Sequence, residues 1–578
     1  MKKRFLKYLS PILITLFIQS CSLDETIYDR PTPGTITTEG DITALIVGMY
    51  ARFNDPGMFK FQGHIMLTAC ADDFFSNSGS EYGPYAQRLF TPANTASMWN
   101  GLYLTIVNAN ELIDVLDNMP KLSESFRNRA YGEAYFIRAF CYYYLVRLYG
   151  GVPLRITPTR VDSDFYLPRA SLAQTYEQIF SDFKKASELL PVKSAIPIAE
   201  LGRASKGAAQ AMLAQAYLTY GDQLLQKGQD ATEYFTNAVV YADSVINSNE
   251  YVLLDNYADL FDIGKETLAY NEVIFGIRFQ TDPTNRAQPA AGSEYALRFN
   301  APNTHFVSAN GNNQNGDGTY RIMHWFADYY RSGDYVDADS VEFDYRYESG
   351  LWVQATGPQS RTYYIYPAVV PAGAGNYTIA TPLCRKYIDP TGKDQRNHGN
   401  DFFIIRLAEV YYIKAEALNE LYGPTSEALA AFNRVRQRAR TANGTPRSVP
   451  ADLTPATAGT KENFRMKIFD DRGLELVGEG QRWFDLVRMP SPLGNNVTMY
   501  EYQFLHRLNN KLSGYPTYST FTSNYPSYNN TTKTWTPRHG VHVYALNVSV
   551  PKFLLFPIPT SELILNKNFG SQNTGWGN

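Results

Sequence analysis

Apolar and polar residues follow a helical period in several long segments of the chain. Between residues 129 and 149, small and apolar residues recur at steps of three and four, which is the spacing of one helix face. Gly150-Gly151 and Pro153 follow this segment and are typical of a helix end. A similar face between residues 203 and 220 is mostly alanine, and the segment from residue 233 could pair with it. Helix faces made of small residues allow two helices to pack closely.

Residues 407 to 439 have the pattern of a helix hairpin. Apolar residues step by three and four from Leu407 to Leu421, Gly423-Pro424 interrupts the pattern, and a second periodic segment follows. The crossing carries small residues, as in one tetratricopeptide unit, but the fixed repeat length of such arrays is not evident. We therefore expect a mainly α fold, with scattered tetratricopeptide-like hairpins as its scaffold.

The middle of the chain lacks this period. Residues 251 to 400 are rich in Gly, Asn, Pro, Thr and Tyr, with short β-like runs such as "NEVIFGIRF" and "RTYYIYPAVV". Residues 441–460 and 508–540 have the same character. These segments predict long irregular loops with small β elements, and loops of such length are usually functional or mobile.

The first residues have the pattern of an export signal. A basic start precedes an apolar stretch from Tyr8 to Ile18, which is too short to span a bilayer. The sequence Ile18-Gln19-Ser20-Cys21 then resembles the bacterial lipobox, in which the cysteine is acylated and becomes the new N-terminus. We expect a lipoprotein signal peptide over 1–20, lipidation of Cys21 and a flexible tether over 21–40. The alternative is a plain signal peptide with an incidental cysteine.

Charge and cysteine content narrow the possible partners. Residues 1–20 carry four basic residues and no acidic ones, so their removal leaves 49 basic against 56 acidic residues. This mildly acidic balance argues against nucleic acid as a ligand. With Cys21 lipidated, Cys70, Cys141 and Cys384 remain, too few for a disulfide framework in so long a chain.

No motif of catalysis or of metal binding stands out. The chain lacks a G-x-S-x-G elbow, an H-E-x-x-H pair and a phosphate-binding glycine loop. His539 and His542 have no evident third ligand, and the loop at 310–321 carries Arg321 where a calcium loop needs glutamate. We expect no metal and no cofactor.

The acid-rich segment 468–489 could be read in two ways. An active site would use Glu475 and Glu479 as a coupled acid pair. A semi-buried helix would instead satisfy these charges internally, and we favour this interpretation and expect no enzyme. The pairs spaced i,i+3 are Arg472/Glu475, Glu479/Arg482, Arg482/Asp485 and Asp485/Arg488.

Five motifs, in order along the chain, resemble the SusD/RagB family. They are "WNGLYLTIVNANELID", "GEAYFIRAFCYYYLVRLYGGVPL", "IRLAEVYYIKAEALNE", "DDRGLELVGEGQRWFDLVRM" and the tail "LFPIPTSELILNKNFGSQNTGWG". The fourth is similar to the family signature R-x-x-E-L-x-x-E-G-x-R-W/F-F-D-L-x-R. With the lipobox, the resemblance runs from Cys21 to the C-terminus.

The resemblance implies a fold, a place and a role. It implies one SusD-like domain over 41–578, with its helical scaffold mainly in 41–250 and 400–490 and a variable ligand-facing region at about 251–400. The protein would be an outer-membrane lipoprotein facing the cell exterior, as in Bacteroidetes. It would bind a glycan and deliver it to a SusC-like TonB-dependent transporter. Peptide or glycopeptide capture, as in RagB-like members, is the alternative.

The family analogy also implies where the ligand binds. Aromatic rings would stack on sugar faces, while Asp, Arg and Asn side chains would hydrogen-bond to hydroxyl groups. Trp99 belongs to a shared family motif and could equally be a core residue. The candidates are Asp73, Tyr82, Arg88, Trp99, Asn100, Tyr295, Trp325 and Trp352.

Overall fold

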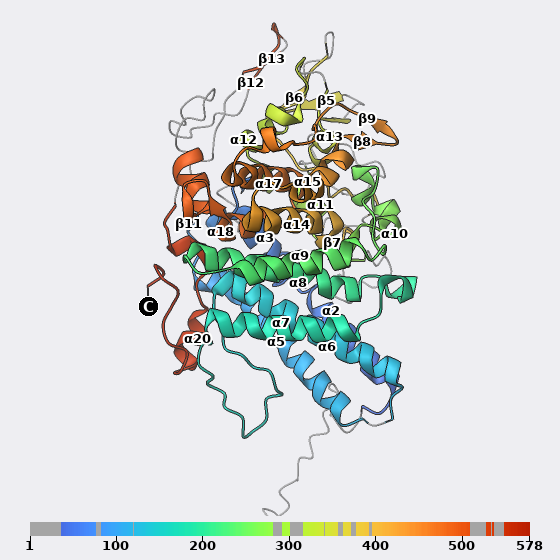
Figure 1. Cartoon of the computed structure of the whole chain (residues 1–578), viewed down its shortest axis with the longest axis vertical. Coiled ribbons are helices and arrows are strands. Elements are labelled where there is room, and N and C mark those ends of the chain that lie inside the picture. The colour runs from blue at the N-terminus through green and yellow to red at the C-terminus, as the bar shows by residue number, and fades with distance from the viewer. Residues whose placement is uncertain are drawn as a thin grey trace, which may run out of the picture.

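The computed structural model shows a helical scaffold with most of its small β elements toward one end and with β7 and β11 nearer the middle (Figure 1). It describes residues 36–76, 83–119, 121–280, 292–300, 316–339, 342–356, 362–371, 377–391, 396–508, 527–532, 534–536 and 548–577. Cys21, Tyr82 and the pair His539/His542 lie outside these ranges. So does the first half of the loop at 310–321.

Long helices form the scaffold. They stack in the order α5, α6, α7, α8, α9, α14 and α15, each packed against the next, so α14 lies on α9 although the whole middle region separates them in sequence. The pairing of α8 with α9 and the α14–α15 hairpin confirm the sequence interpretation. The larger helices are α2 (Glu39–Arg52), α3 (Gln62–Ala69), α5 (Pro92–Asp117), α6 (Glu124–Tyr149), α7 (Leu172–Leu189), α8 (Lys206–Gln226), α9 (Thr232–Ile246), α14 (Leu407–Tyr422), α15 (Ser426–Ala439), α17 (Lys461–Glu475) and α18 (Arg482–Arg488).

Helix α6 shows how the sequence positions these elements. Its predicted face, which includes Ala134, Ile137 and Cys141, is fully buried. Gly150, at a φ of +79°, ends the helix in a conformation that other residues rarely adopt. Close approach to α7 depends on Gly132, where a Cβ would lie 2.8 Å from Leu190 Cγ.

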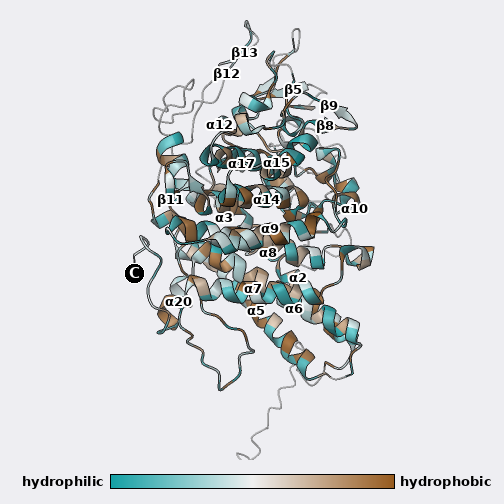
Figure 2. Ribbon diagram, viewed as in Figure 1, coloured by the Kyte–Doolittle hydropathy of each residue, from teal (hydrophilic) through white to brown (hydrophobic). Residues whose placement is uncertain are grey.

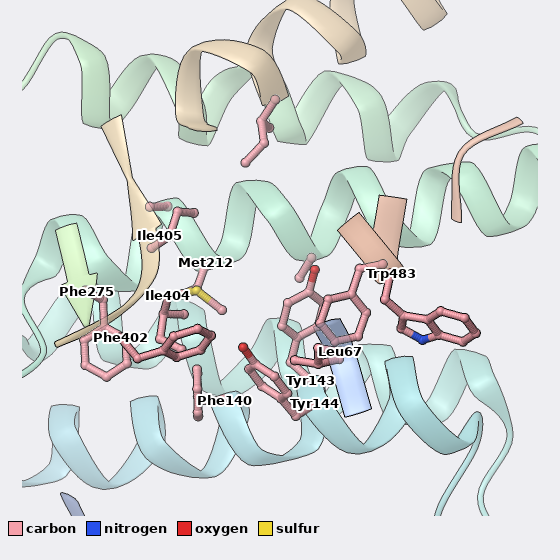
Figure 3. Close-up of a cluster of buried hydrophobic side chains, with 14 of the residues drawn as sticks. Leu67, Phe140, Tyr143, Tyr144, Met212, Phe275, Phe402, Ile404, Ile405 and Trp483 are labelled. Atoms are coloured by element: carbon pink, nitrogen blue, oxygen red, sulfur yellow. The ribbon is translucent and has the colours of Figure 1, made fainter. Parts of the chain in front are cut away.

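The core is rich in aromatic rings where α6 and α8 meet the β2–β7 pair (Figure 3). Phe140 lies 4.8 Å from Tyr144 and 5.7 Å from Phe275 between ring centroids. Such edge and tilted contacts add to the free energy gained by burial. Most rings of the described chain therefore serve packing rather than ligand binding.

The β elements are small, as expected. Strand β2 (Val273–Ile277) pairs antiparallel with β7 (Phe402–Arg406) and joins the middle region to α14. A three-stranded sheet contains β4 (Gln354–Thr356), β5 (Thr362–Ile365) and β6 (Thr378–Ile379). The other strands are β1 (Phe74–Ser76), β3 (Tyr320–Ile322), β8 (Thr441–Ala442), β9 (Thr445–Pro446), β10 (Pro490–Ser491), β11 (Gly494–Thr498), β12 (Ser527–Asn529) and β13 (Thr534–Thr536).

Short helices connect these parts. They are α4 (Gly83–Ala86), α10 (Glu266–Ala269), α11 (Tyr295–Phe299), α12 (His324–Tyr329), α13 (Tyr345–Gly350), α16 (Pro455–Ala458), α19 (Met499–Glu501) and α20 (Thr560–Leu565), with a π-helical turn at Tyr502–Arg507. Helices of the described chain carry both hydrophilic and hydrophobic residues along their length (Figure 2). Within the described residues, no helix combines the length and hydropathy needed to cross a membrane.

The segment 468–489 differs from its prediction as one helix. It forms α17 and α18 with a turn between them, because Gly478 and Gly480 adopt φ values of +77° and +71°. Of the predicted i,i+3 pairs, Arg488 and Asp485 form an ion pair of 2.7 Å. Arg472 also pairs with Asp485 at 3.0 Å across the turn, whereas Arg482 binds the distant Asp72 at 2.7 Å. The charges are satisfied, as expected, but largely through tertiary contacts.

Candidate functional site

Four of the predicted ligand-binding residues lie in the interior. Tyr295, Trp325, Arg88 and Asp73 are each at most 3% exposed. A surface ligand meets none of these side chains in this structure, because neighbouring side chains cover them.

Their contacts are those of core residues. The Trp325 indole donates to the Asp72 carbonyl at 2.9 Å, and Arg88 Nε donates to the Tyr500 hydroxyl at 2.8 Å. The Tyr295 hydroxyl donates to the Phe59 carbonyl. Burial, followed by the nearby charge of Asp72, raises the pKa of Asp73 to about 8.

Trp99 and Asn100 lie together on α5, at the far end of the scaffold from the β4–β5–β6 sheet (Figure 1). Trp99 is 3% exposed and packs against Tyr103 and Tyr149, each with a centroid separation of 5.0 Å. Asn100 is exposed. Both residues line a groove of about 480 Å³.

Trp352 lies elsewhere, beside the three-stranded sheet. Antiparallel pairing sets Ala355 opposite Tyr363, and parallel pairing sets Ile365 beside Ile379. Because strand side chains alternate between faces, these four residues share one face of the sheet. Ala355, Ile365 and Ile379 form a small buried cluster, against which half-buried Trp352 and Tyr363 pack.

Four rings therefore gather around this sheet and the preceding helix α13. Tyr363 and Tyr377 lie 5.5 Å apart between centroids, and Tyr377 is 37% exposed. Tyr345, in the first turn of α13, is half-buried and belongs to the same end of the molecule. We call Tyr345, Trp352, Tyr363 and Tyr377 the aromatic strip.

Charged groups hold the aromatic strip in place. The Arg447 guanidinium lies 3.6 Å from the Tyr345 ring centroid and pairs with Glu348 at 3.1 Å. Arg385 donates to the Glu348 carbonyl at 2.9 Å and lies 5.5 Å from the Trp352 ring. The strip thus presents apolar ring faces beside guanidinium donors, which together suit a ligand with apolar faces and hydroxyl groups.

The sequence identified Trp352 but not its neighbours as site residues. Tyr363 lies in the run "RTYYIYPAVV", which was recognised as β-like. Predicting that the Tyr363 ring joins this group requires knowing which strands pair with its own strand, and the sequence does not show that. No cluster of three or more potential metal-ligating side chains occurs among the described residues.

Two family models match the chain. The model described as "SusD family" matches residues 271–576, which is more than half of the chain. The model described as "Starch-binding associating with outer membrane" matches residues 23–218.

Individual relatives agree with this result. SusD-like protein P2 of Formosa agariphila is 28% identical over 478 residues, which cover 80% of this chain and 85% of the relative. A SusD homologue from Bacteroides thetaiotaomicron shares the fold at a TM-score of 0.73 and 19% identity, covering 94% of this chain and 98% of its own. A laminarin-binding SusD-like protein has a TM-score of 0.64 at 21% identity and covers 93% and 100%.

Proposed function

Because the chain belongs to the SusD family, we propose that it is a cell-surface lipoprotein that binds a glycan at the aromatic strip. It would then deliver the glycan to a SusC-like TonB-dependent outer-membrane transporter. The family description "Starch-binding associating with outer membrane" and the laminarin-binding relative support a carbohydrate as the ligand class. We propose capture without hydrolysis.

The observation that carries this proposal is the gathering of Trp352, Tyr363 and Tyr377 on one small sheet. Three rings beside Arg385 offer stacking surfaces and hydrogen-bond donors at one end of the molecule. A sugar ring has an apolar C–H face and a rim of hydroxyl groups, so one pyranose can use both kinds of contact.

The place of action follows from the first residues of the sequence. Processing after Ser20 and acylation of Cys21 would anchor the chain, and two acyl chains suffice for stable attachment. The tether between the lipid and the folded domain would then end before Ile36 and not at residue 40 as expected, because Ile36 is buried in the core and α2 begins at Glu39. We propose an outer-membrane position facing the exterior.

Affinity electrophoresis of residues 22–578 tests the ligand class. The gels would contain starch, laminarin, xylan, mannan, pectin or host-type glycans, with bovine serum albumin as the reference protein. We expect retardation by one class. Purified protein incubated with that glycan should release no reducing ends.

Variants then test the site. Tyr377→Ala removes a ring that is 37% exposed, and Trp352→Ala removes a half-buried one. Each should weaken binding about tenfold or more, which corresponds to about 1.4 kcal/mol. Val240→Ala, an exposed scaffold change on α9, is the matched control and should bind normally. Unchanged retardation of both ring variants, or retention of casein peptides instead of glycans, would contradict the proposal.

A further inference from the structure

The groove beside Trp99 lies far from the aromatic strip. It has a volume of about 480 Å³ and is enclosed by α5, the segment 153–167 and α20. In Figure 1, α5 and α20 lie toward one end of the long axis, and β5 and β6 lie at the other. One short ligand therefore cannot occupy both places.

Rings form the apolar walls of this groove. Trp99 and Tyr103 pack with centroids 5.0 Å apart and an interplanar angle of 44°. Phe165 faces them from the opposite segment and is 54% exposed, which is unusual for so large an apolar side chain. An exposed ring at the mouth of a concave surface is typical of a ligand contact.

Two charged groups in the groove have no ion-pair partner in the described part of the chain. Arg155 donates from Nη2 to the Asp164 carbonyl at 3.1 Å. Glu562 accepts a hydrogen bond of 3.0 Å from Asn566 Nδ2. Both charges act on the Tyr103 hydroxyl. Its pKa is raised mainly by burial and further by Tyr142 and Glu562, whereas Arg155 and Arg169 lower it. The groove lining thus carries one positive and one negative side chain, Arg155 and Glu562.

Hydrogen bonds hold the walls of the groove in place without a ligand. Asn566 Nδ2 donates to the Leu167 carbonyl at 2.9 Å, and Asn568 Nδ2 donates to the Tyr166 carbonyl at 2.7 Å. These bonds fix the segment that carries Phe165 against α20. A preformed site loses less conformational entropy on binding than a mobile one.

We propose that this groove is a second carbohydrate site, which takes a neutral oligosaccharide segment. The ligand class rests on the proposed function, whereas the groove and its selectivity rest on the residues above. Phe165 and Tyr103 would stack on sugar faces, while Arg155, Glu562 and Asn100 would exchange hydrogen bonds with hydroxyl groups. Because the two charges balance, the groove discriminates against uronic acids and sulfated sugars. Two sites at opposite ends allow a long glycan to be held at two points, which raises the apparent affinity.

Calorimetry on residues 22–578 tests the proposal with oligosaccharides from partial hydrolysis of starch and of laminarin. We expect the wild type to bind two equivalents of one of these, Phe165→Ala to bind one, and Trp352→Ala to bind one. Asn100→Ala, a second variant of the groove, should resemble Phe165→Ala. Val161→Ala is the matched control, because Val161 lies on the same segment and is 98% exposed but does not line the groove. It should retain both equivalents.

The possible failures are distinguishable. One equivalent in the wild type that Phe165→Ala retains and Trp352→Ala loses would overturn the groove site and leave the proposed function intact. One equivalent lost only in Phe165→Ala would support the groove and contradict the aromatic strip. No binding of either glycan would overturn the inference, as would displacement of the oligosaccharide from Trp352→Ala protein by polygalacturonate.

Discussion

At the scale of single residues, stability depends most strongly on a network of buried ion pairs. Glu475 accepts hydrogen bonds from Arg346, Arg406 and Arg438, all of which are almost fully buried. Burial alone would raise the pKa of Glu475, but Arg438, Arg406 and Arg346 outweigh it and hold the pKa well below its usual range. Each member of such a network depends on the others, since a buried charge without a partner is costly.

Loss of Arg406 should therefore be severe. Arg406→Met keeps most of the volume but removes the guanidinium that lies 2.9 Å from both Glu272 and Glu479, so that Arg438 and Lys386 remain as their partners. We expect the free energy of unfolding in urea to fall by about 3–5 kcal/mol. Arg52→Met is the control, since the Arg52–Asp55 pair is exposed, and its effect should stay within about 1 kcal/mol. Equal losses of stability in the two variants would show that the buried ion pairs contribute no more to stability than an exposed pair.

Asp73 gives the protein a pH dependence of opposite sign to that of Glu475. Its pKa rises from 3.8 to about 8 on folding, so the folded state holds a proton that the unfolded state releases. Stability from this group is complete below about pH 4 and is lost as the pH rises toward 8, by up to about 1.4 kcal/mol per pH unit. Asp73→Asn mimics the protonated form and should flatten this slope in urea unfolding curves. Parallel pH profiles of the two proteins would disprove the assignment.

Sequence reasoning named single site residues without predicting which of them are exposed. Trp99 and Asn100 were candidates from a family motif, and the structure places both on one helix and at a groove. Tyr295 and Trp325 come from the irregular middle region, where no period distinguishes an inward ring from an outward one. Whether any of these residues binds a ligand stays a prediction.

At the scale of elements, periodic segments were predictable and the turn between α17 and α18 was not. Helices α6, α8, α9, α14 and α15 follow from local spacing of apolar residues. The signature segment also has helical spacing of its charges, yet Glu479 pairs with Lys386 at 2.6 Å and with Arg406 at 2.9 Å. Tertiary ion pairs therefore decide this turn, and a single sequence does not reveal them.

The turn itself can be tested at Gly478. A Cβ there would lie 3.3 Å from Cys384 Sγ, on a backbone with a φ of +77°. Gly478→Ala should lower the free energy of unfolding by about 1–2 kcal/mol. Gly48→Ala is the control, because Gly48 lies in α2 with open space around its Cβ position, and it should stabilise by about 0.5–1 kcal/mol. A neutral Gly478→Ala would show that the turn tolerates other residues.

At the scale of the whole molecule, the sequence predicts the helical scaffold but not the surfaces that we propose bind ligand. One hydrophobic cluster extends from Ile36 to Phe569 and includes Cys70, Cys141 and Cys384. These cysteines are free and buried. The fold class was predictable because this cluster draws on periodic helices. The two proposed binding surfaces were not predictable, because each combines segments that are distant in sequence and that no local pattern brings together.

Thiol reactivity reports on this global packing. Burial raises the pKa of Cys70 to about 12 and that of Cys384 to about 11. Both therefore stay protonated at neutral pH, and a protonated thiol reacts much more slowly than a thiolate. Native protein of residues 22–578 treated with iodoacetamide should stay unmodified by mass spectrometry, while protein in urea should gain three adducts. Addition of a reductant should leave the thermal midpoint unchanged. Partial labelling without denaturant would reveal local opening.

The hydrogen bonds that hold the groove segment also indicate when the groove forms during folding. Asn566 bonds to Leu167 across 399 positions, and Asn573 Nδ2 bonds to the Tyr149 carbonyl across 424. Contacts over such separations form late, after local helices and their hairpins. A chain that emerges from its N-terminal side can assemble α5 to α9 early, but it has no groove until residues 560–573 have followed. The proposed recognition at that end of the molecule would thus be acquired last, and a chain that lacks residues 560–573 would have the helical scaffold but no groove.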